Sequence, residues 1–181
     1  LGDKSSSDPQ SEATAASLNP DGIHVKRSEG FSSWEEIAQD SPFIIIAEVG
    51  LRIDTAVVDG AEGLRFPITE LRVTNAIKGD ISIGDSIRLI QTADIAEDPL
   101  VSEGECVLLF LERFSGPQTD DPDTYVCNGL FDGHYIIQDN RVMESYSAPD
   151  SLGRVKLQDG KLWGVDNRLD AVVAHVSGLC D

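Results

Sequence analysis

Residues 66–92 read FPITELRVTNAIKGDISIGDSIRLIQT and predict two β-strands joined by turns. Leu71 and Val73 alternate with polar residues in the first run, and Ile87 and Leu89 do so in the second. Successive side chains of a strand point to opposite faces of a sheet, so this alternation is typical of strands with one buried face. The Gly and Asp residues between the runs tolerate turn geometry. The stretch therefore predicts a sheet, and it indicates no particular chemistry.

The sequence on either side of this stretch predicts further strands. Residues 43–49 and 104–111 are apolar runs of strand length. Asp139-Asn140 and Asp159-Gly160 each separate two alternating runs, and such pairs favour two-residue hairpin turns because both residues accept positive φ. Residues 50–65 contain glycines and scattered charges, and they predict a loop or an irregular hairpin.

Two segments predict helices that pack on this sheet. Residues 32–40 open with Ser32 and Ser33, and either serine can form a capping box with the glutamate three residues later. Trp34 is the expected core anchor of this helix. From Leu169 onward, apolar residues recur with helical spacing on one face. The predicted fold class is mainly β, namely an antiparallel OB-like β-barrel with an N-terminal and a C-terminal helix packed on it.

Composition restricts the partners. The 181 residues include 14 Lys and Arg against 32 Asp and Glu, which leaves a formal net charge of −18. Such a charge repels nucleic acid and anionic lipid. No apolar run approaches the roughly 18 residues of a membrane-spanning helix. We therefore expect no nucleic-acid partner and no transmembrane span.

Residues 1–22 differ in composition from the rest of the chain. They are rich in Ser, Ala and Asp and nearly devoid of large apolar residues, so they bury too little surface to offset the entropy of ordering. We expect a flexible tether followed by a single β-barrel domain over residues 23–181. Secreted and lipid-anchored bacterial proteins carry such tethers, and a lipid anchor upstream of the chain is compatible with this organisation.

The order of these motifs resembles a known group of domains. A Lys78-Gly79-Asp80 turn is followed by Gly104-Glu105 ahead of a Leu- and Phe-rich strand. This pattern is similar to that of uncharacterised exported bacterial domains, often lipoproteins, with a small OB-like barrel resembling the tissue metalloproteinase inhibitor and netrin modules. The resemblance covers about residues 34–143 and implies an extracytoplasmic location. It implies no functional residue, because residues 1–17 lack the N-terminal cysteine with which such inhibitors bind a catalytic metal.

The three cysteines permit one disulfide. None of them has the spacing of a zinc site. A Cys127–Cys180 bond would hold the C-terminus, and Cys106–Cys127 is the alternative pairing.

Candidate site residues come from loops and strand ends. Asp120, Asp121 and Asp123 form an acidic loop that is a weak calcium candidate, although its spacing does not match an EF-hand. His134 begins a strand, where loops at the mouth of a barrel often carry function. Tyr125 and Tyr135, with Tyr146, are candidates for a stacking platform of the kind that OB-folds use, for which the net charge favours carbohydrate. No metal or cofactor is expected.

The motifs of serine hydrolases, zinc proteases and nucleotide-binding loops are absent. The sequence therefore predicts a non-catalytic extracytoplasmic binding or interaction domain with a protein or carbohydrate partner. The alternatives are a hydrolase that uses loop carboxylates and His134, and a structural envelope protein.

Overall fold

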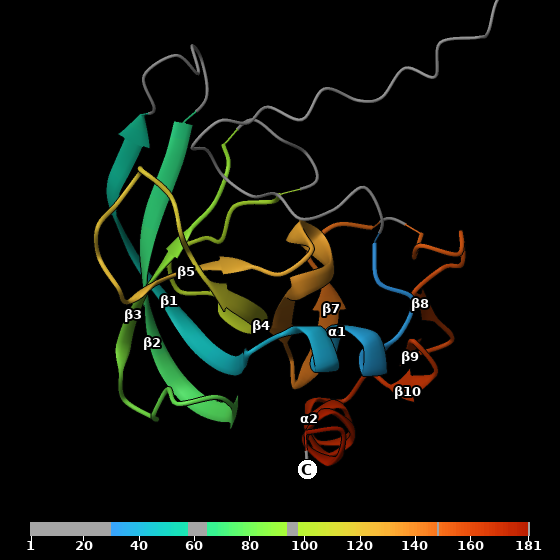
Figure 1. The fold of residues 1–181 in the computed structure, drawn as a ribbon. Helices are drawn as coiled ribbons and strands as arrows, with labels where there is room; N and C mark the ends of the chain where they lie inside the picture. The colour runs from blue at the N-terminus through green and yellow to red at the C-terminus, as the bar shows by residue number, and fades with distance from the viewer. Residues whose placement is uncertain (1–29, 58–64, 94–97, 148, 181) are drawn as a thin grey trace, which may run out of the picture.

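The computed structural model describes residues 30–57, 65–93, 98–147 and 149–180, so the predicted tether at residues 1–22 lies outside it. Figure 1 shows a twisted sheet with both α-helices and a small ribbon on one side. The elements are α1 (Trp34–Asp40), β1 (Phe43–Val57), β2 (Arg65–Lys78), β3 (Ser86–Ile90), β4 (Cys106–Arg113), β5 (Thr124–Cys127), the 3₁₀ helix η1 (Leu130–Gly133), β6 (His134–Gln138), β7 (Arg141–Glu144), β8 (Leu157–Gln158), β9 (Lys161–Leu162), β10 (Val165–Asp166) and α2 (Leu169–Gly178).

The main sheet closes into a ring of strand pairings. Its order is β1-β2-β3-β5-β4-β6-β7, and β1 also pairs with β4, so five strands form a cycle that β6 and β7 extend. The predicted mainly β fold with two helices is thus confirmed. One pairing departs from the expected antiparallel arrangement, because β5 enters between β3 and β4 and runs parallel to β3. The C-terminal ribbon is a separate three-stranded sheet formed by β8, β9 and β10.

Alternation along β1 and β4 builds two cores from the same strands. The ring-interior core takes Ile45 and Leu109, with their alternate neighbours along each strand and residues from β2, β3 and β5. The outer core takes Ile44 and Leu108, which pack against Trp34 of α1, α2 and the C-terminal ribbon. Because both cores use β1 and β4, these strands are buried on both faces, as the continuous apolar runs indicate.

The first helix begins as a capping motif predicts. Ser33 is its N-cap, and the Ser33 hydroxyl accepts a hydrogen bond from the backbone N–H of Glu36 at 3.3 Å. The Glu36 carboxylate in turn accepts from the backbone N–H of Ser32 at 2.7 Å. Trp34 is 1% exposed, so its predicted role as a core anchor is confirmed.

The predicted hairpin turns are also confirmed. Asp139 and Asn140 have φ of 50° and 60°, and they join β6 to β7. Asp159 and Gly160 have φ of 52° and 71°, and they join β8 to β9.

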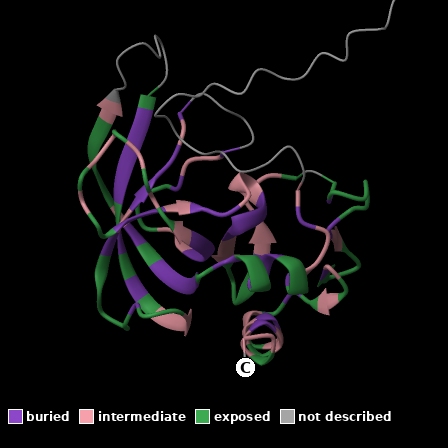
Figure 2. Cartoon of the chain, viewed as in Figure 1, coloured by how far each residue is buried: buried purple, intermediate pink, exposed green. Residues whose placement is uncertain are grey.

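Of the two structures predicted for residues 50–65, the irregular hairpin is confirmed over residues 50–57, which pair with β2 through two register irregularities. β1 continues through them to Val57 and pairs with β2 as far as Arg65, so the two strands project beyond the ring. Leu51 to Thr55 are all exposed, as Figure 2 shows for the far part of β1. An exposed strand lacks a regular apolar pattern, so the sequence carries little signal for it.

Within the described residues, no helix has the length and apolar character needed to cross a membrane.

Candidate functional site

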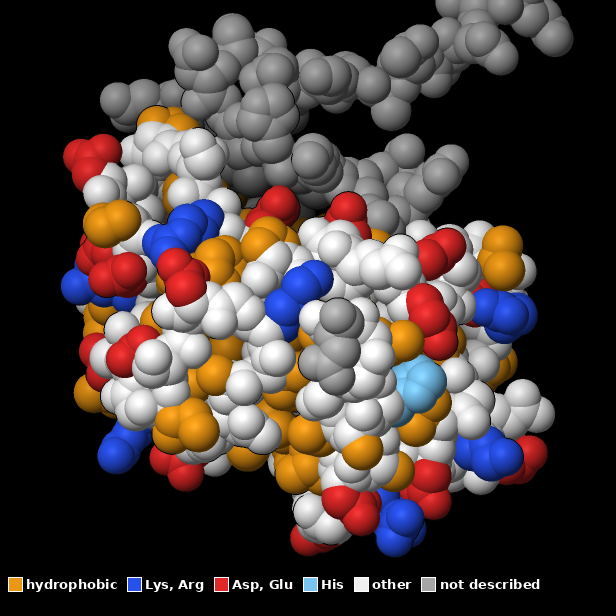
Figure 3. Space-filling model, turned by 60° about the horizontal axis from the view of Figure 1, so that its bottom comes forward, with side chains coloured by type: hydrophobic (Ala, Val, Ile, Leu, Met, Phe, Trp, Pro, Cys, Tyr) orange, Lys and Arg blue, Asp and Glu red, His pale blue; other side chains and the backbone are white. Residues whose placement is uncertain are grey.

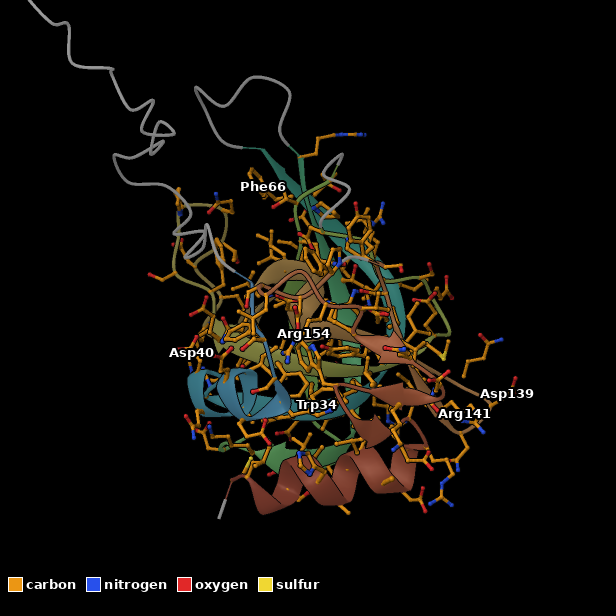
Figure 4. All side chains as sticks on the ribbon, turned by 90° about the vertical axis from the view of Figure 1, so that its right-hand side faces the viewer. Trp34, Asp40, Phe66, Asp139, Arg141 and Arg154 are labelled. Carbon is orange, nitrogen blue, oxygen red and sulfur yellow. The ribbon has the colours of Figure 1, made fainter. Side chains whose placement is uncertain are left out.

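A hollow of about 820 Å³ lies between the start of α1 and the C-terminal ribbon. Small-molecule sites in proteins typically have volumes of roughly 300–1,000 Å³. Figure 4 looks onto the side of the molecule that carries the ribbon and labels Trp34 and Arg154. The walls of the hollow include Ser32, Ser33, Arg154, Gln158, Lys161 and Trp163.

Arg154 makes two side-chain hydrogen bonds at the rim of the hollow. Its Nε donates to Asp150 Oδ2 at 2.7 Å, and its Nη2 donates to the Ser32 carbonyl at 2.7 Å. Burial alone would raise the pKa of Asp150, but hydrogen bonds from Arg154 and from the Leu152 backbone lower it. The Asp150 carboxylate therefore stays charged. Its hydrogen bond keeps the Arg154 guanidinium beside the segment that precedes α1.

One residue that lines the hollow, Lys156, belongs to a buried charged cluster, which we call the Lys156 cluster. It consists of Lys156, Asp132 and Glu144, whose side chains are 0%, 1% and 9% exposed. Lys156 Nζ lies 2.7 Å from Asp132 Oδ1 and 3.7 Å from Glu144 Oε1. Charges so deeply buried are costly unless they are paired, so the cluster depends on all three side chains.

Aromatic rings surround the Lys156 ammonium group. It lies 4.5 Å from the centroid of the Phe131 ring and 5.6 Å from that of Trp163. Burial raises the pKa of Glu144, and Lys156 offsets part of that effect. Burial also raises the pKa of Tyr135 well above its ordinary value, and the charges of Asp132 and Glu144 add to this effect.

Three polar atoms beside the cluster make no hydrogen bond to any described residue. They are Glu144 Oε1, the Tyr135 hydroxyl and Trp163 Nε1. Buried polar groups normally have hydrogen-bond partners, so this concentration of atoms without one distinguishes the surroundings of the ion pair.

A tight turn brings Asp132 into the cluster. Gly129 has φ of 71°, and a Cβ there would lie 2.7 Å from a ring carbon of Phe31, so only glycine fits. The turn leads into η1, whose Asp132 Oδ2 accepts the backbone N–H of Phe31 at 2.8 Å. Through this hydrogen bond, the Asp132 carboxylate links the segment after β5 to the segment before α1.

None of the predicted site residues lines this hollow. His134 is 1% exposed, and burial lowers its pKa to about 4, an effect that the nearby Pro99 carbonyl only partly offsets. Tyr125 belongs to the ring-interior core, where its ring contacts Phe43. Tyr135 belongs to the outer core, packed against Trp34. Buried in two different cores, the two tyrosines do not share an exposed platform.

The acidic loop is tied to its neighbours by its own side chains. Asp121 forms an ion pair with Arg88, and its Oδ1 accepts the backbone N–H of Asp123 at 2.8 Å. Arg113 also donates to the Pro122 carbonyl at 2.8 Å. The structure does not gather Asp120, Asp121 and Asp123 into a cation site, and no described group of three or more His, Cys, Asp or Glu residues has that geometry.

Neither predicted disulfide is formed. Cys127 pairs with Leu111 near the end of β4, whereas Cys106 begins that strand. Five residues of strand span about 17 Å, far more than the ~7 Å between Cα atoms that a disulfide allows. Cys127 is buried in the ring-interior core, whereas Cys180 packs against the outer core, so the sheet separates them. Burial raises the pKa of the Cys127 thiol well above its ordinary value, which leaves the thiol unreactive.

Sequence reasoning missed the Lys156 cluster. Lys156 lies between Val155 and Leu157 in a run that predicts a half-exposed strand, where a lysine is expected to face solvent. Asp132 and Glu144 come from separate elements, and no motif spacing links them to the lysine.

No protein-family model matches the sequence, and no curated protein matches it.

Proposed function

We propose that the chain is a non-catalytic, extracytoplasmic binding domain of a secreted or lipid-anchored bacterial protein, and that its hollow beside Trp163 binds a carbohydrate. The closed ring of strand pairings supports an OB-like barrel as its framework. The acidic composition and the resemblance to exported domains support the location.

The observation that carries the proposal is the composition of the hollow. Trp163 presents a partly exposed indole, and around it lie the fixed guanidinium of Arg154 and the exposed side chains of Gln158 and Lys161. An aromatic surface flanked by donors and acceptors suits a sugar, which has apolar ring faces and hydroxyl groups at its edges. The ordered partners of Arg154 keep one donor group in place before a ligand arrives.

The charge of the molecule also favours a neutral ligand. With a net charge of −18, the protein repels polyanions at long range. Acidic and basic side chains are interspersed on the face shown in Figure 3. A neutral sugar is bound without having to overcome this repulsion.

We do not extend the proposal to catalysis. A hydrolase that uses His134 requires an imidazole nitrogen within reach of the substrate. His134 is 1% exposed at the start of β6 and is not among the residues that line the hollow.

The first test is a fluorescence titration of the protein with neutral, N-acetylated and acidic oligosaccharides. Trp34 is buried, so a change in emission on binding reports mainly on Trp163. We expect at least one neutral sugar to change the emission and to raise the melting temperature. Lys161→Ala and Gln158→Ala should each lower the affinity for that sugar, several-fold to about tenfold, as expected for the loss of one hydrogen bond.

Arg72→Ala is the matched control, because Arg72 is an exposed cation on β2 and does not line the hollow. It should bind the sugar with unchanged affinity. The proposal is wrong if no sugar in the panel binds, or if Lys161→Ala and Gln158→Ala bind as tightly as the parent protein.

A further inference from the structure

The three members of the Lys156 cluster have the arrangement of reactants rather than that of a simple ion pair. An amine and a carboxyl group stand in contact at 2.7 Å, and a second carboxyl group stands 3.7 Å from the same nitrogen. Asp132 lies in η1, Glu144 in β7 and Lys156 just before β8, and the two side chains in contact are 24 residues apart. A single ion pair needs no second carboxylate with an oxygen that makes no hydrogen bond.

The surroundings of Lys156 exclude bulk water. The side chain is 0% exposed and lies beside the rings of Phe131 and Trp163. The 2.7 Å contact places a Lys156 proton within transfer distance of Asp132 Oδ1, and the burial of both side chains keeps bulk water away from them. A desolvated neutral lysine is a nucleophile.

We propose that Lys156 Nζ and Asp132 Cγ join in an intramolecular amide bond, with Glu144 as the proton carrier and one water molecule released. This cross-link is independent of any ligand in the hollow.

The reaction balances without a further reactant. One proton passes from the Lys156 ammonium to Asp132 Oδ1, which leaves an amine and a carboxylic acid. The nitrogen lone pair then forms a bond to Cγ, and Glu144 takes a proton from the nitrogen. Glu144 returns that proton to Oδ1 as the Cγ–Oδ1 bond breaks, so Oδ1 leaves as water. Glu144 ends as it began, and the charges of Lys156 and Asp132 cancel in the amide.

The carbonyl that remains is already held in place. Asp132 Oδ2 accepts the backbone N–H of Phe31 at 2.8 Å, which stabilises the negative charge that develops on this oxygen during attack. The contact also requires a glycine just before Phe31, because a Cβ on Gly30 would lie 2.7 Å from Oδ2. Oδ1 faces the nitrogen and is the oxygen that departs.

The bond would fasten η1 to the segment that enters the C-terminal ribbon. A covalent link across the chain restricts the unfolded state, as a disulfide does. The three cysteines form no disulfide in this structure, so the amide would be the cross-link of the domain.

The test is the intact mass of the denatured full chain after incubation at neutral pH until the mass is constant. We expect the parent protein to weigh about 18 Da less than its sequence, the mass of one water. Proteolysis should yield a branched peptide that joins the Asp132 and Lys156 segments. Glu144→Gln, which keeps the size of the side chain, should weigh the full mass of its sequence.

Lys156→Arg should also keep its full mass, whereas the matched variant Lys161→Arg should still lose one water. These variants exclude a succinimide at Asp132-Gly133, which releases water without any lysine. The proposal is overturned if the parent protein has its full mass, or if Lys156→Arg still loses water. The parent measurement decides the question even if a variant fails to fold.

Discussion

At the scale of single residues, His134 is the clearest example of a polar group placed by the fold. It is 1% exposed at the start of β6. Burial lowers its pKa from 6.5 to about 4. The imidazole is therefore neutral in the native protein at neutral pH, and it acts there as a packing residue beside β4, where it pairs with Leu109.

This pKa shift makes the native state sensitive to acid. An unfolded chain protonates His134 near pH 6.5, whereas the folded protein does so only near pH 4, so the unfolded state binds more protons between these values. The free energy of unfolding should fall as the pH drops through this window, by about 3 kcal/mol from this residue. Asp98 and Glu144 act in the opposite direction, because burial raises their pKa values and acid relieves the cost of their buried charges.

The contribution of His134 can be isolated by measuring the free energy of unfolding in urea for the parent protein and for His134→Leu at about pH 7, 5.5 and 4. The variant should lose less stability on acidification than the parent, by up to about 3 kcal/mol between the extremes. Parallel curves for the two proteins would contradict the assigned pKa.

At the scale of elements, β1 lies between two strands in its first part and at an edge of the sheet in its last part. Its pairing with β4 ends at Glu48, and beyond that point the described part of β1 pairs with β2 alone. Leu51 and Ile53 are 62% and 44% exposed on this free edge. Two register irregularities and the charges of Arg52 and Asp54 accompany them. Bulges and charges are the features with which proteins oppose unwanted pairing at a sheet edge.

The double variant Arg52→Val and Asp54→Val should therefore self-associate, because it removes both charges and adds two β-branched residues to the edge. Its net charge remains −18, since one positive and one negative charge are lost together. Light scattering coupled to size-exclusion chromatography should show a larger average mass than for the parent at equal concentration.

Arg72→Val with Asp80→Val is the control for this experiment. It also conserves the net charge, but Arg72 lies on β2, which has strands on both sides. If both double variants associate equally, or if neither does, the interpretation of the β1 edge is wrong.

At the scale of the whole molecule, the two cores are coupled through the strands they share. β1 and β4 send alternate residues into the ring interior and into the outer core. Trp34 is central to the outer core, where its ring contacts Phe110 and Tyr135 and its Nε1 donates to the Leu162 carbonyl at 3.0 Å. This one side chain thereby connects α1, the sheet and the C-terminal ribbon.

Trp34→Ala should destabilise the whole domain by roughly 3–5 kcal/mol, because it opens a large cavity and leaves the Leu162 carbonyl without this donor. Unfolding should remain a single transition when followed by far-UV circular dichroism and by the fluorescence of Trp163. Leu152→Ala is the control, since Leu152 is 67% exposed and its loss should change stability by at most about 0.5 kcal/mol. Two separate transitions would show that the outer layer unfolds independently of the ring.

The sequence by itself determined the features that depend on neighbouring residues. The cap of Ser33 with Glu36 and the turns at Asp139-Asn140 and Asp159-Gly160 follow from local hydrogen bonding and backbone preference. The strand pair that contains Leu71 and Ile87 follows from alternation with period two. These signals are short in range, so they are visible without the fold.

Only the tertiary structure decided which distant residues meet. The closing pair of β1 with β4 and the parallel pair of β3 with β5 join segments that no turn connects directly. The Lys156 cluster likewise depends on how η1, β7 and the segment before the ribbon pack together. Burial reverses the exposure that the sequence alone predicts for Lys156 and His134. Burial is a property of the packed molecule rather than of any short stretch of chain.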